Sequence, residues 1–108
     1  ISLTREIGME PLVEITSEKE FETAYTCGAA IVDINNRNLA TLETDLNVSK
    51  RIAAIIPHDI IPVEASGIST RADIENGISH GMFNFLVGES IVRSDNPVSF
   101  IKELRNDR

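Results

Sequence analysis

The chain has 108 residues, enough for one modest hydrophobic core, and we expect residues 1–108 to form a single domain. Hydrophobic residues make up 42% and charged residues 25%, which is the balance of a soluble globular protein. The formal net charge of −7 argues against nucleic acid or an anionic membrane as a partner. A small anionic substrate stays possible, because local backbone N–H groups can hold an anion against the overall field.

The cysteine content and the apolar runs indicate the cellular compartment of the protein. Cys27 is the only cysteine, so there is no internal disulfide framework, which fits a reducing cytosol. No apolar run reaches the ~18 residues of a membrane span, and no signal peptide is visible. We therefore expect a cytoplasmic protein. The chain opens within a helical pattern and without an initiator methionine, so we expect a fragment of a longer protein.

The periodicity of apolar residues predicts a helix tail followed by alternating strands and helices. In chain order these are a helix tail at 1–7, a strand at 12–15, a helix from Ser17 to Cys27, a strand at 29–34, a helix from Asp45 to Pro57, a strand at 60–63, a helix at 71–80, a strand at 82–87, a short helical turn at 89–93, and a last helix from Pro97. Strands alternating with helices of roughly 10 residues predict a parallel sheet with right-handed crossovers.

Local signals mark the ends of these helices. Ser17 with Glu20 is a capping box, and Asn96 before Pro97 caps the last helix. Thr70 with Asp73 resembles another cap. The apolar residues expected to point inward from the third and last helices are Leu46, Val48, Ile52, Ala53, Ile55, Ile56, Val98, Phe100, Ile101 and Leu104. The strands are continuous apolar runs, which predicts a sheet covered on both faces, although Pro62 argues against full pairing of the third strand.

Two consecutive strands end in turns of small residues. Ser66-Gly67-Ile68 follows the third strand, and Gly88-Glu89-Ser90 follows the fourth where a short helix begins. Glycines let the backbone approach a ligand closely, and N–H groups exposed in such turns bind anions. Their recurrence on consecutive strands is typical of the phosphate grip of a (βα) barrel.

Four segments together resemble indole-3-glycerol-phosphate synthase: GMEPLVE at 8–14, INNRNL at 34–39, SGI at 66–68 and LVGES at 86–90. The resemblance covers essentially the whole chain. It implies an α/β fold, the C-terminal half of a TIM (βα)8 barrel, with four βα units (strands five to eight) preceded by a helix tail. It also implies tryptophan biosynthesis, in which the family closes the indole ring of a carboxyphenylamino-deoxyribulose phosphate with loss of carbon dioxide and water, using no metal or organic cofactor.

The resemblance carries roles over to individual residues. Glu14 matches a general acid/base, Asn35 matches an asparagine that orients the reacting groups, and Ser66 matches a serine near the substrate, which gives three catalytic candidates. A carboxylate in a half-dry pocket suits acid/base work. The implied substrate-binding residues are Arg37 and Leu86, and the implied phosphate-binding residues are Gly67, Gly88, Glu89 and Ser90.

Two positions depart from the family pattern. Ala65 stands where the family usually has glutamate, and Glu64 comes one residue earlier, so strand alternation turns Glu64 away from the site unless a bulge intervenes. Asn38 stands where aspartate is common in the family. An asparagine has no charge to pair with Arg37, so the ion pair that would orient this arginine is lost. The family's catalytic lysines belong to the first half of the barrel. The lysines here lie on predicted helices, so we expect the chain to be inactive alone.

Other interpretations stay open. Taken alone, Glu14 could be a solvated residue at a strand end, and Asn35-Asn36 could be turn formers. The chain could be a non-catalytic half barrel that self-associates as a dimer, or that complements a first-half chain, because an open sheet exposes two edges and an apolar face. It could also be another phosphate-binding barrel of the tryptophan pathway, although the segment 34–39 fits the synthase better. The expected ligand is a phosphorylated small molecule.

Overall fold

The computed structural model describes residues 1–37, 45 and 47–105. Its elements are α1 (Ser2–Glu6), β1 (Leu12–Ile15), α2 (Glu18–Thr26), β2 (Ile31–Asn35), α3 (Asn47–Ala53), β3 (Ile61–Ala65), α4 (Arg71–Ser79), β4 (Phe85–Leu86), α5 (Glu89–Arg93) and α6 (Pro97–Arg105). The four strands form one parallel sheet in the order β1-β2-β3-β4. This confirms the predicted α/β fold of four βα units preceded by a helix tail.

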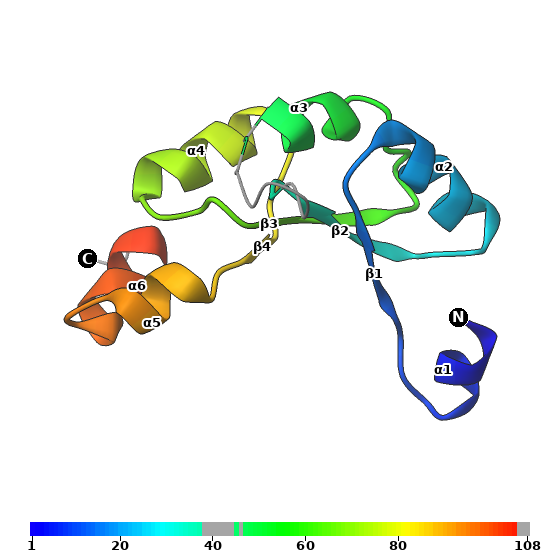
Figure 1. The fold of residues 1–108 in the computed structure, drawn as a ribbon, viewed down its shortest axis with the longest axis horizontal. Helices are drawn as coiled ribbons and strands as arrows, with labels where there is room; N and C mark the ends of the chain where they lie inside the picture. The colour runs from blue at the N-terminus through cyan, green and yellow to red at the C-terminus, as the bar shows by residue number, and fades with distance from the viewer. Residues whose placement is uncertain (38–44, 46, 106–108) are drawn as a thin grey trace.

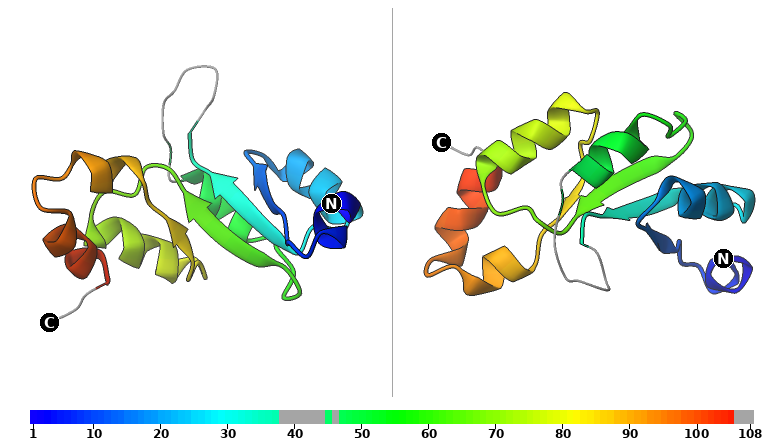
Figure 2. Two further views of the ribbon diagram at one scale, coloured as in Figure 1. Left: turned by 90° about the horizontal axis from the view of Figure 1, so that it is seen from below. Right: turned by 45° about the horizontal axis from the view of Figure 1, so that its top comes forward.

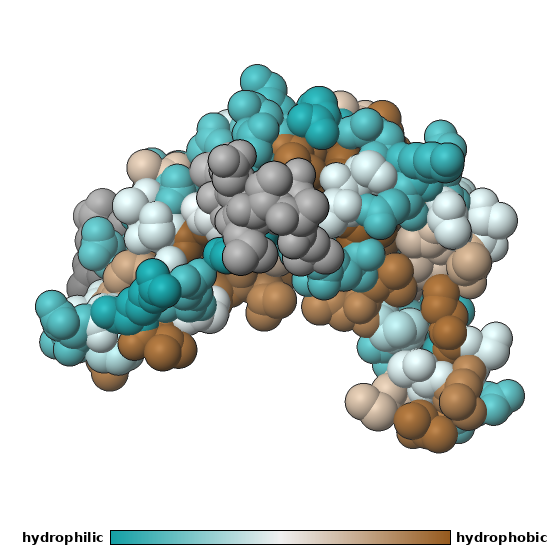
Figure 3. All heavy atoms as spheres, viewed as in Figure 1, coloured by the Kyte–Doolittle hydropathy of each residue, from teal (hydrophilic) through white to brown (hydrophobic). Residues whose placement is uncertain are grey.

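The helices cover one face of the sheet. In Figure 1, α2, α3 and α4 lie along one side of the strands, whereas α1 and the α5–α6 pair lie at the two ends. The sheet is therefore open on the other side, and the space-filling view has a wide concave edge there, with hydrophobic side chains along it (Figure 3). The prediction that both faces are covered is wrong, because Leu12, Ile61 and Leu86 are each about half exposed.

Alternation along the strands separates two sets of side chains. The helix-facing set forms the main core, which contains the fully buried Val32 and Ile34 of β2, together with Ile52 of α3 and Met82. A smaller core forms where α6 packs against α4 and α5 (Figure 2), around Ile68, Ile74 and Leu104. None of the helices in the described ranges is long and apolar enough to cross a membrane.

The capping signals place the helix starts close to their predicted positions. At α4 the Thr70 hydroxyl accepts from the Asp73 N–H at 3.2 Å, and the Asp73 carboxylate accepts from the Thr70 N–H at 3.0 Å, which completes a capping box. At α2 the Ser17 hydroxyl accepts from the Glu20 N–H at 3.1 Å, but the Glu20 carboxylate bonds to Thr16 instead of Ser17. The predicted box is thus only half formed there.

Several predicted positions differ in the structure. The strand predicted at 82–87 is only Phe85–Leu86. Ile55 is 46% exposed because α3 ends at Ala53, before that residue. Val98 is 64% exposed, although it belongs to the apolar residues of α6 that were expected to point inward. Leu46, also predicted to be buried, lies outside the described residues.

Gly77 of α4 lies where the helix closely approaches side chains of the sheet. A Cβ atom built on Gly77 would lie 2.7 Å from Glu64 Oε2 and 2.7 Å from Phe85 Cε1. Real Cβ atoms do not approach so closely, so the helix can pack at this distance only with glycine. Gly77 therefore sets how closely α4 lies against β3 and β4, the strands that lead into the two small-residue turns.

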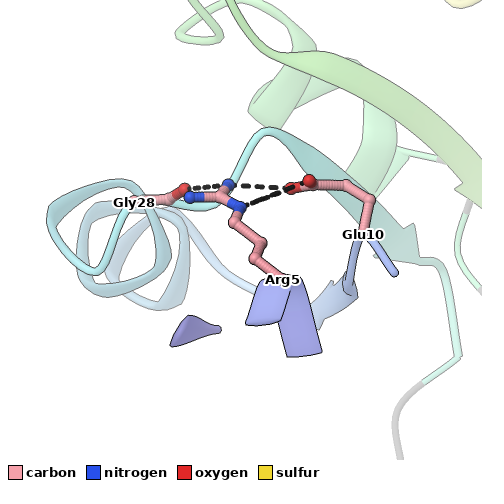
Figure 4. Close-up of polar contacts among 3 residues, drawn as sticks. All are labelled: Arg5, Glu10 and Gly28. Atoms are coloured by element: carbon pink, nitrogen blue, oxygen red, sulfur yellow. Dashed lines mark hydrogen bonds and ion pairs between the residues drawn. The ribbon is translucent and has the colours of Figure 1, made fainter. Parts of the chain in front are cut away.

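One arginine connects the first helix to the rest of the chain (Figure 4). The Arg5 Nη2 group donates to the Glu10 carboxylate at 2.7 Å and to the Gly28 carbonyl at 2.8 Å. The first bond spans the turn between α1 and β1, and the second reaches the residue that ends the α2 segment. Arg5 therefore positions α1 beside the start of the sheet, although both ionic side chains are substantially exposed.

Candidate functional site

A pocket of about 450 Å³ lies at the carboxyl ends of the strands. This is the end at which parallel α/β proteins generally bind ligands. Side chains and turns from all four strands line it. All nine residues singled out from the sequence are among the lining residues, namely Glu14, Asn35, Arg37, Ser66, Gly67, Leu86, Gly88, Glu89 and Ser90. The structure thus brings together a set of residues that spans 77 positions of the sequence.

The register of the sheet explains this convergence. Glu14 on β1 is the register partner of Asp33 on β2. Asn35 on β2 pairs with Ala65 on β3, which in turn pairs with Leu86 on β4. Side chains two residues apart on a strand share a face. These positions therefore form two rows across the sheet, both on the face that the α2–α4 layer leaves open.

A short hydrogen-bond chain orients the polar groups of the pocket. The Asn35 Nδ2 group donates to Glu14 Oε1 at 2.6 Å, and Asn35 Oδ1 accepts from the Arg37 backbone N–H at 2.9 Å. The second bond fixes which end of the amide is the oxygen, so the first necessarily presents an N–H to Glu14. The Glu14 carboxylate is consequently held in place at the pocket while remaining exposed to solvent.

Arg37 reaches across the pocket to the fourth βα unit. Its Nη2 group lies 2.9 Å from Glu89 Oε2, and Arg93 pairs with the other Glu89 oxygen at 3.0 Å. Such exposed pairs contribute little stability. They leave the Glu89 carboxylate balanced by two cations beside the Gly88 turn, which reduces its repulsion of an anionic ligand. Asn38 and Leu39, which belong to the same polar segment, lie outside the described residues.

The two small-residue turns contact each other directly. Ser66 and Gly67 both have positive φ angles, of 66° and 77°, so the chain turns sharply after β3. This conformation is unusual for serine and ordinary for glycine. The Ser90 hydroxyl donates to the Ile68 carbonyl at 2.9 Å and connects the second turn to the first. A Cβ built on Gly88 would meet no atom within 4 Å, so this turn leaves open space at the pocket.

Glu64 points away from the pocket, as strand alternation predicts. The register of β3 against β2 is continuous from Ile61 to Ala65, so no bulge brings Glu64 to the open face. Its side chain is fully buried toward the helices, where Glu64 Oε1 accepts from the Ser49 hydroxyl at 2.9 Å and from Asn36 Nδ2 at 3.4 Å. Burial raises the pKa of Glu64, an effect that these two hydrogen bonds partly offset.

This buried network supports the site from behind. Asn36 Nδ2 also donates to the Ser66 carbonyl at 3.1 Å, and Asn36 Oδ1 accepts from the Ser49 N–H at 3.1 Å. Asn36 therefore joins the helix α3 to the turn after β3. Its neighbour Asn35 lines the pocket, so the two consecutive asparagines at the end of β2 serve opposite faces of the sheet.

Sequence analysis missed one charged residue of the pocket. Asp33 lines it, is only 8% exposed, and has a buried Oδ1 atom without a hydrogen-bond partner among the described residues. Burial raises the pKa of Asp33, and the negative charge of Glu14 raises it further. The available signal was alternation, because Asp33 lies two residues before Asn35 and must share its face. In the described part of the chain, no three His, Cys, Asp or Glu side chains group as metal ligands.

Comparisons with known proteins agree on one family. Residues 1–104 match the family model of indole-3-glycerol phosphate synthase. The chain is 47% identical over 104 residues to an indole-3-glycerol phosphate synthase of Desulfosudis oleivorans, covering 96% of this chain and 40% of that protein. It is 42% identical over 103 residues to a multifunctional tryptophan biosynthesis protein of Schizosaccharomyces pombe, covering 95% of this chain and 14% of that protein. The chain thus spans well under half the length of these relatives.

Solved structures share the fold at low sequence identity. A chain of the Amycolatopsis orientalis BexX/CysO complex superposes with a TM-score of 0.76 at 20% identity, covering 94% of this chain and 42% of that chain. A native KDPGal structure superposes with a TM-score of 0.67 at 21% identity, covering 92% of this chain and 50% of that chain. Both match this chain with about half of themselves or less, as a half barrel requires.

Proposed function

Because the chain belongs to the indole-3-glycerol phosphate synthase family, we propose that it supplies one half of a tryptophan-pathway lyase site. The reaction would be the decarboxylating ring closure of a carboxyphenylamino-deoxyribulose phosphate. The observation that carries the proposal is a pocket that brings the Glu14–Asn35 pair together with two linked glycine turns. The family match favours this reaction over other phosphate-binding barrels.

We assign different roles to two parts of the pocket. The turns at Gly67 and Gly88 would bind the phosphate through backbone N–H groups, with Arg37 and Ser90 beside it. The Glu14 carboxylate, oriented by Asn35, would exchange protons with the substrate. Ser66 and Leu86 would contact the substrate between these parts. The proposed setting is the cytoplasm, which rests on the biosynthetic role of the family.

We propose that this chain alone does not complete the reaction. Its three lysines, Lys19, Lys50 and Lys102, lie on α2, α3 and α6, and none lines the pocket. The resemblance assigns the family's catalytic lysines to the first half of the barrel. Without them the developing charge of the reaction lacks its electrostatic stabilisation.

The test is an indole-ring-closure assay with the chain alone and mixed with the first half of the Desulfosudis oleivorans relative. We expect product only in the mixture, and loss of product with Glu14→Gln. A matched control is Glu22→Gln, because Glu22 is an exposed residue of α2 far from the pocket. Turnover by the chain alone would overturn the inactivity proposal. A mixture that forms a complex without turnover, together with no calorimetric binding of millimolar phosphate, would overturn the site proposal.

A second candidate function is self-association without catalysis. The open face carries the half-exposed Leu12, Ile61 and Leu86, and β1 and β4 are both edge strands. Exposed apolar surface and unpaired strand edges favour association, so two copies could cover each other as a pseudo-barrel. Sedimentation should then report a dimer that Ile61→Lys disrupts and Val92→Lys, on the exposed surface of α5, leaves intact. A monomer at all accessible concentrations would contradict this candidate.

A further inference from the structure

We propose that Asp33 is a further functional residue of the pocket, where it and Glu14 form a carboxyl pair whose single proton is held by Asp33. Asp33 donates this proton in a hydrogen bond to an oxygen atom of the substrate. The inference rests on the proposed function and deepens it, because it adds a neutral acid to a site whose other polar side chains include Glu14, Asn35 and Arg37.

The geometry of the sheet places the two carboxyls together. Asp33 on β2 is the register partner of Glu14 on β1, and paired residues on neighbouring parallel strands share a face. Their strands are about 4.8 Å apart, as in any sheet. Both residues line the same pocket. No other pair of acidic residues occupies partner positions in the described sheet.

Asp33 is also a costly residue for the fold. It is more than nine-tenths buried, and its Oδ1 atom has no hydrogen-bond partner among the described residues. A buried carboxylate without partners destabilises a protein, whereas a buried carboxyl that keeps its proton costs much less. Such uncompensated groups in a pocket are typical of functional sites.

The surroundings of Asp33 favour a proton on its carboxyl group. Glu14 Oε1 already accepts a hydrogen bond from Asn35 Nδ2 at 2.6 Å. From β3, the neighbours of Asp33 on this face are the uncharged Val63 and Ala65. Arg37, the cation among the lining residues of the pocket, is paired with Glu89 at 2.9 Å. Nothing on β4 is charged, and Glu64 lies on the opposite face of the sheet.

Asp33 lines the pocket, so a ligand bound there lies beside it. Ala65 pairs with Asn35 and contributes only a methyl group to the same pocket. A protonated carboxyl at this position can donate one hydrogen bond to a carbonyl or hydroxyl oxygen, which Glu14 as a carboxylate cannot do.

The first test is a carbon-13 NMR titration of the aspartate carboxyl groups of the chain. We expect one aspartate to titrate above the ordinary value of 3.8. Its signal should disappear in Asp33→Asn, shift toward the ordinary value in Glu14→Gln, and stay unchanged in Asp95→Asn, a variant of an exposed loop residue. An Asp33 signal that titrates at its ordinary value, or that Glu14→Gln leaves in place, would overturn the pair.

The second test uses the mixture that the ring-closure assay defines. Asp33→Val should lower kcat by about 10²-fold, the usual effect of removing one hydrogen-bond donor to a reacting oxygen. Asp33→Asn keeps a donor and should lose less. Equal kcat values for Asp33→Val and the parent chain would overturn the functional role. The titration does not depend on turnover, so a mixture without activity counts against the proposed function, while the titration alone then decides on the pair.

Discussion

Replacing Gly77 by alanine tests how tightly α4 packs against the strands that carry the pocket. In an exposed helix this change stabilises a protein by about 1 kcal/mol. Here the added Cβ would lie 2.7 Å from both Glu64 Oε2 and Phe85 Cε1. Glu64 cannot move freely because Ser49 and Asn36 hold its other oxygen. Overpacking of this kind costs about 3 kcal/mol at its upper range, which leaves a net loss of about 2 kcal/mol.

The assay is urea denaturation of the parent and variant chains, followed by circular dichroism. Asn76→Ala is a matched control, because Asn76 is the exposed neighbour of Gly77 on α4. The control should gain about 0.5 kcal/mol from helix propensity alone. If Gly77→Ala is as stable as the parent, or gains stability like the control, then the helix tolerates a wider separation from β3 and β4 and the packing argument is wrong.

Three further variants probe separate parts of the molecule. Burial raises the pKa of Glu64 above its unfolded value of 4.5, so the parent chain should lose stability relative to Glu64→Gln as pH rises from 4.5. Urea denaturation at stepped pH measures this, and a difference in unfolding free energy that stays constant with pH would refute it. Gly88→Ala should change the free energy of unfolding by no more than about 0.5 kcal/mol, because the added Cβ meets no atom within 4 Å. The variant should nevertheless bind inorganic phosphate more weakly in calorimetry, and an unchanged affinity would contradict the proposed phosphate site. Arg5→Ala removes the bonds to Glu10 and Gly28, so it should speed amide hydrogen exchange in α1 without moving the midpoint of unfolding. An unchanged exchange rate would show that other contacts position α1.

The sequence predicted most of the fold because the signals that mark element ends are local. The Thr70 cap and the Asn96 cap act within one turn of helix, and both form as expected. The candidate site residues converge for a comparable reason: parallel strands present their carboxyl ends at one edge, so strand-end residues must meet. Their convergence follows from topology alone, and their catalytic and phosphate-binding roles remain predictions.

The wrong predictions concern what packs against an element, which periodicity does not contain. Ile55 and Val98 fit an apolar stripe, but Ile55 falls beyond the end of α3 and Val98 is 64% exposed. The half-exposed Leu12 and Ile61 belong to a face that only further strands or another chain would cover. Asp33 is a single acidic residue inside an apolar strand, and the strand pattern alone does not mark it as a residue of the pocket.

The neighbours Glu64 and Ala65 carry a consequence for how this family can change by mutation. Exchanging these two residues would leave the composition and the length of the chain unaltered. It would nevertheless transfer a carboxyl group through the thickness of the sheet, from the Ser49 and Asn36 donors to the pocket side. The swap would cost the helix layer its acceptor and give the pocket a fourth acid beside Glu14, Asp33 and Glu89. The order of the two residues therefore decides whether one carboxyl faces the helix layer or the pocket, and substitution counts alone would overlook such a change.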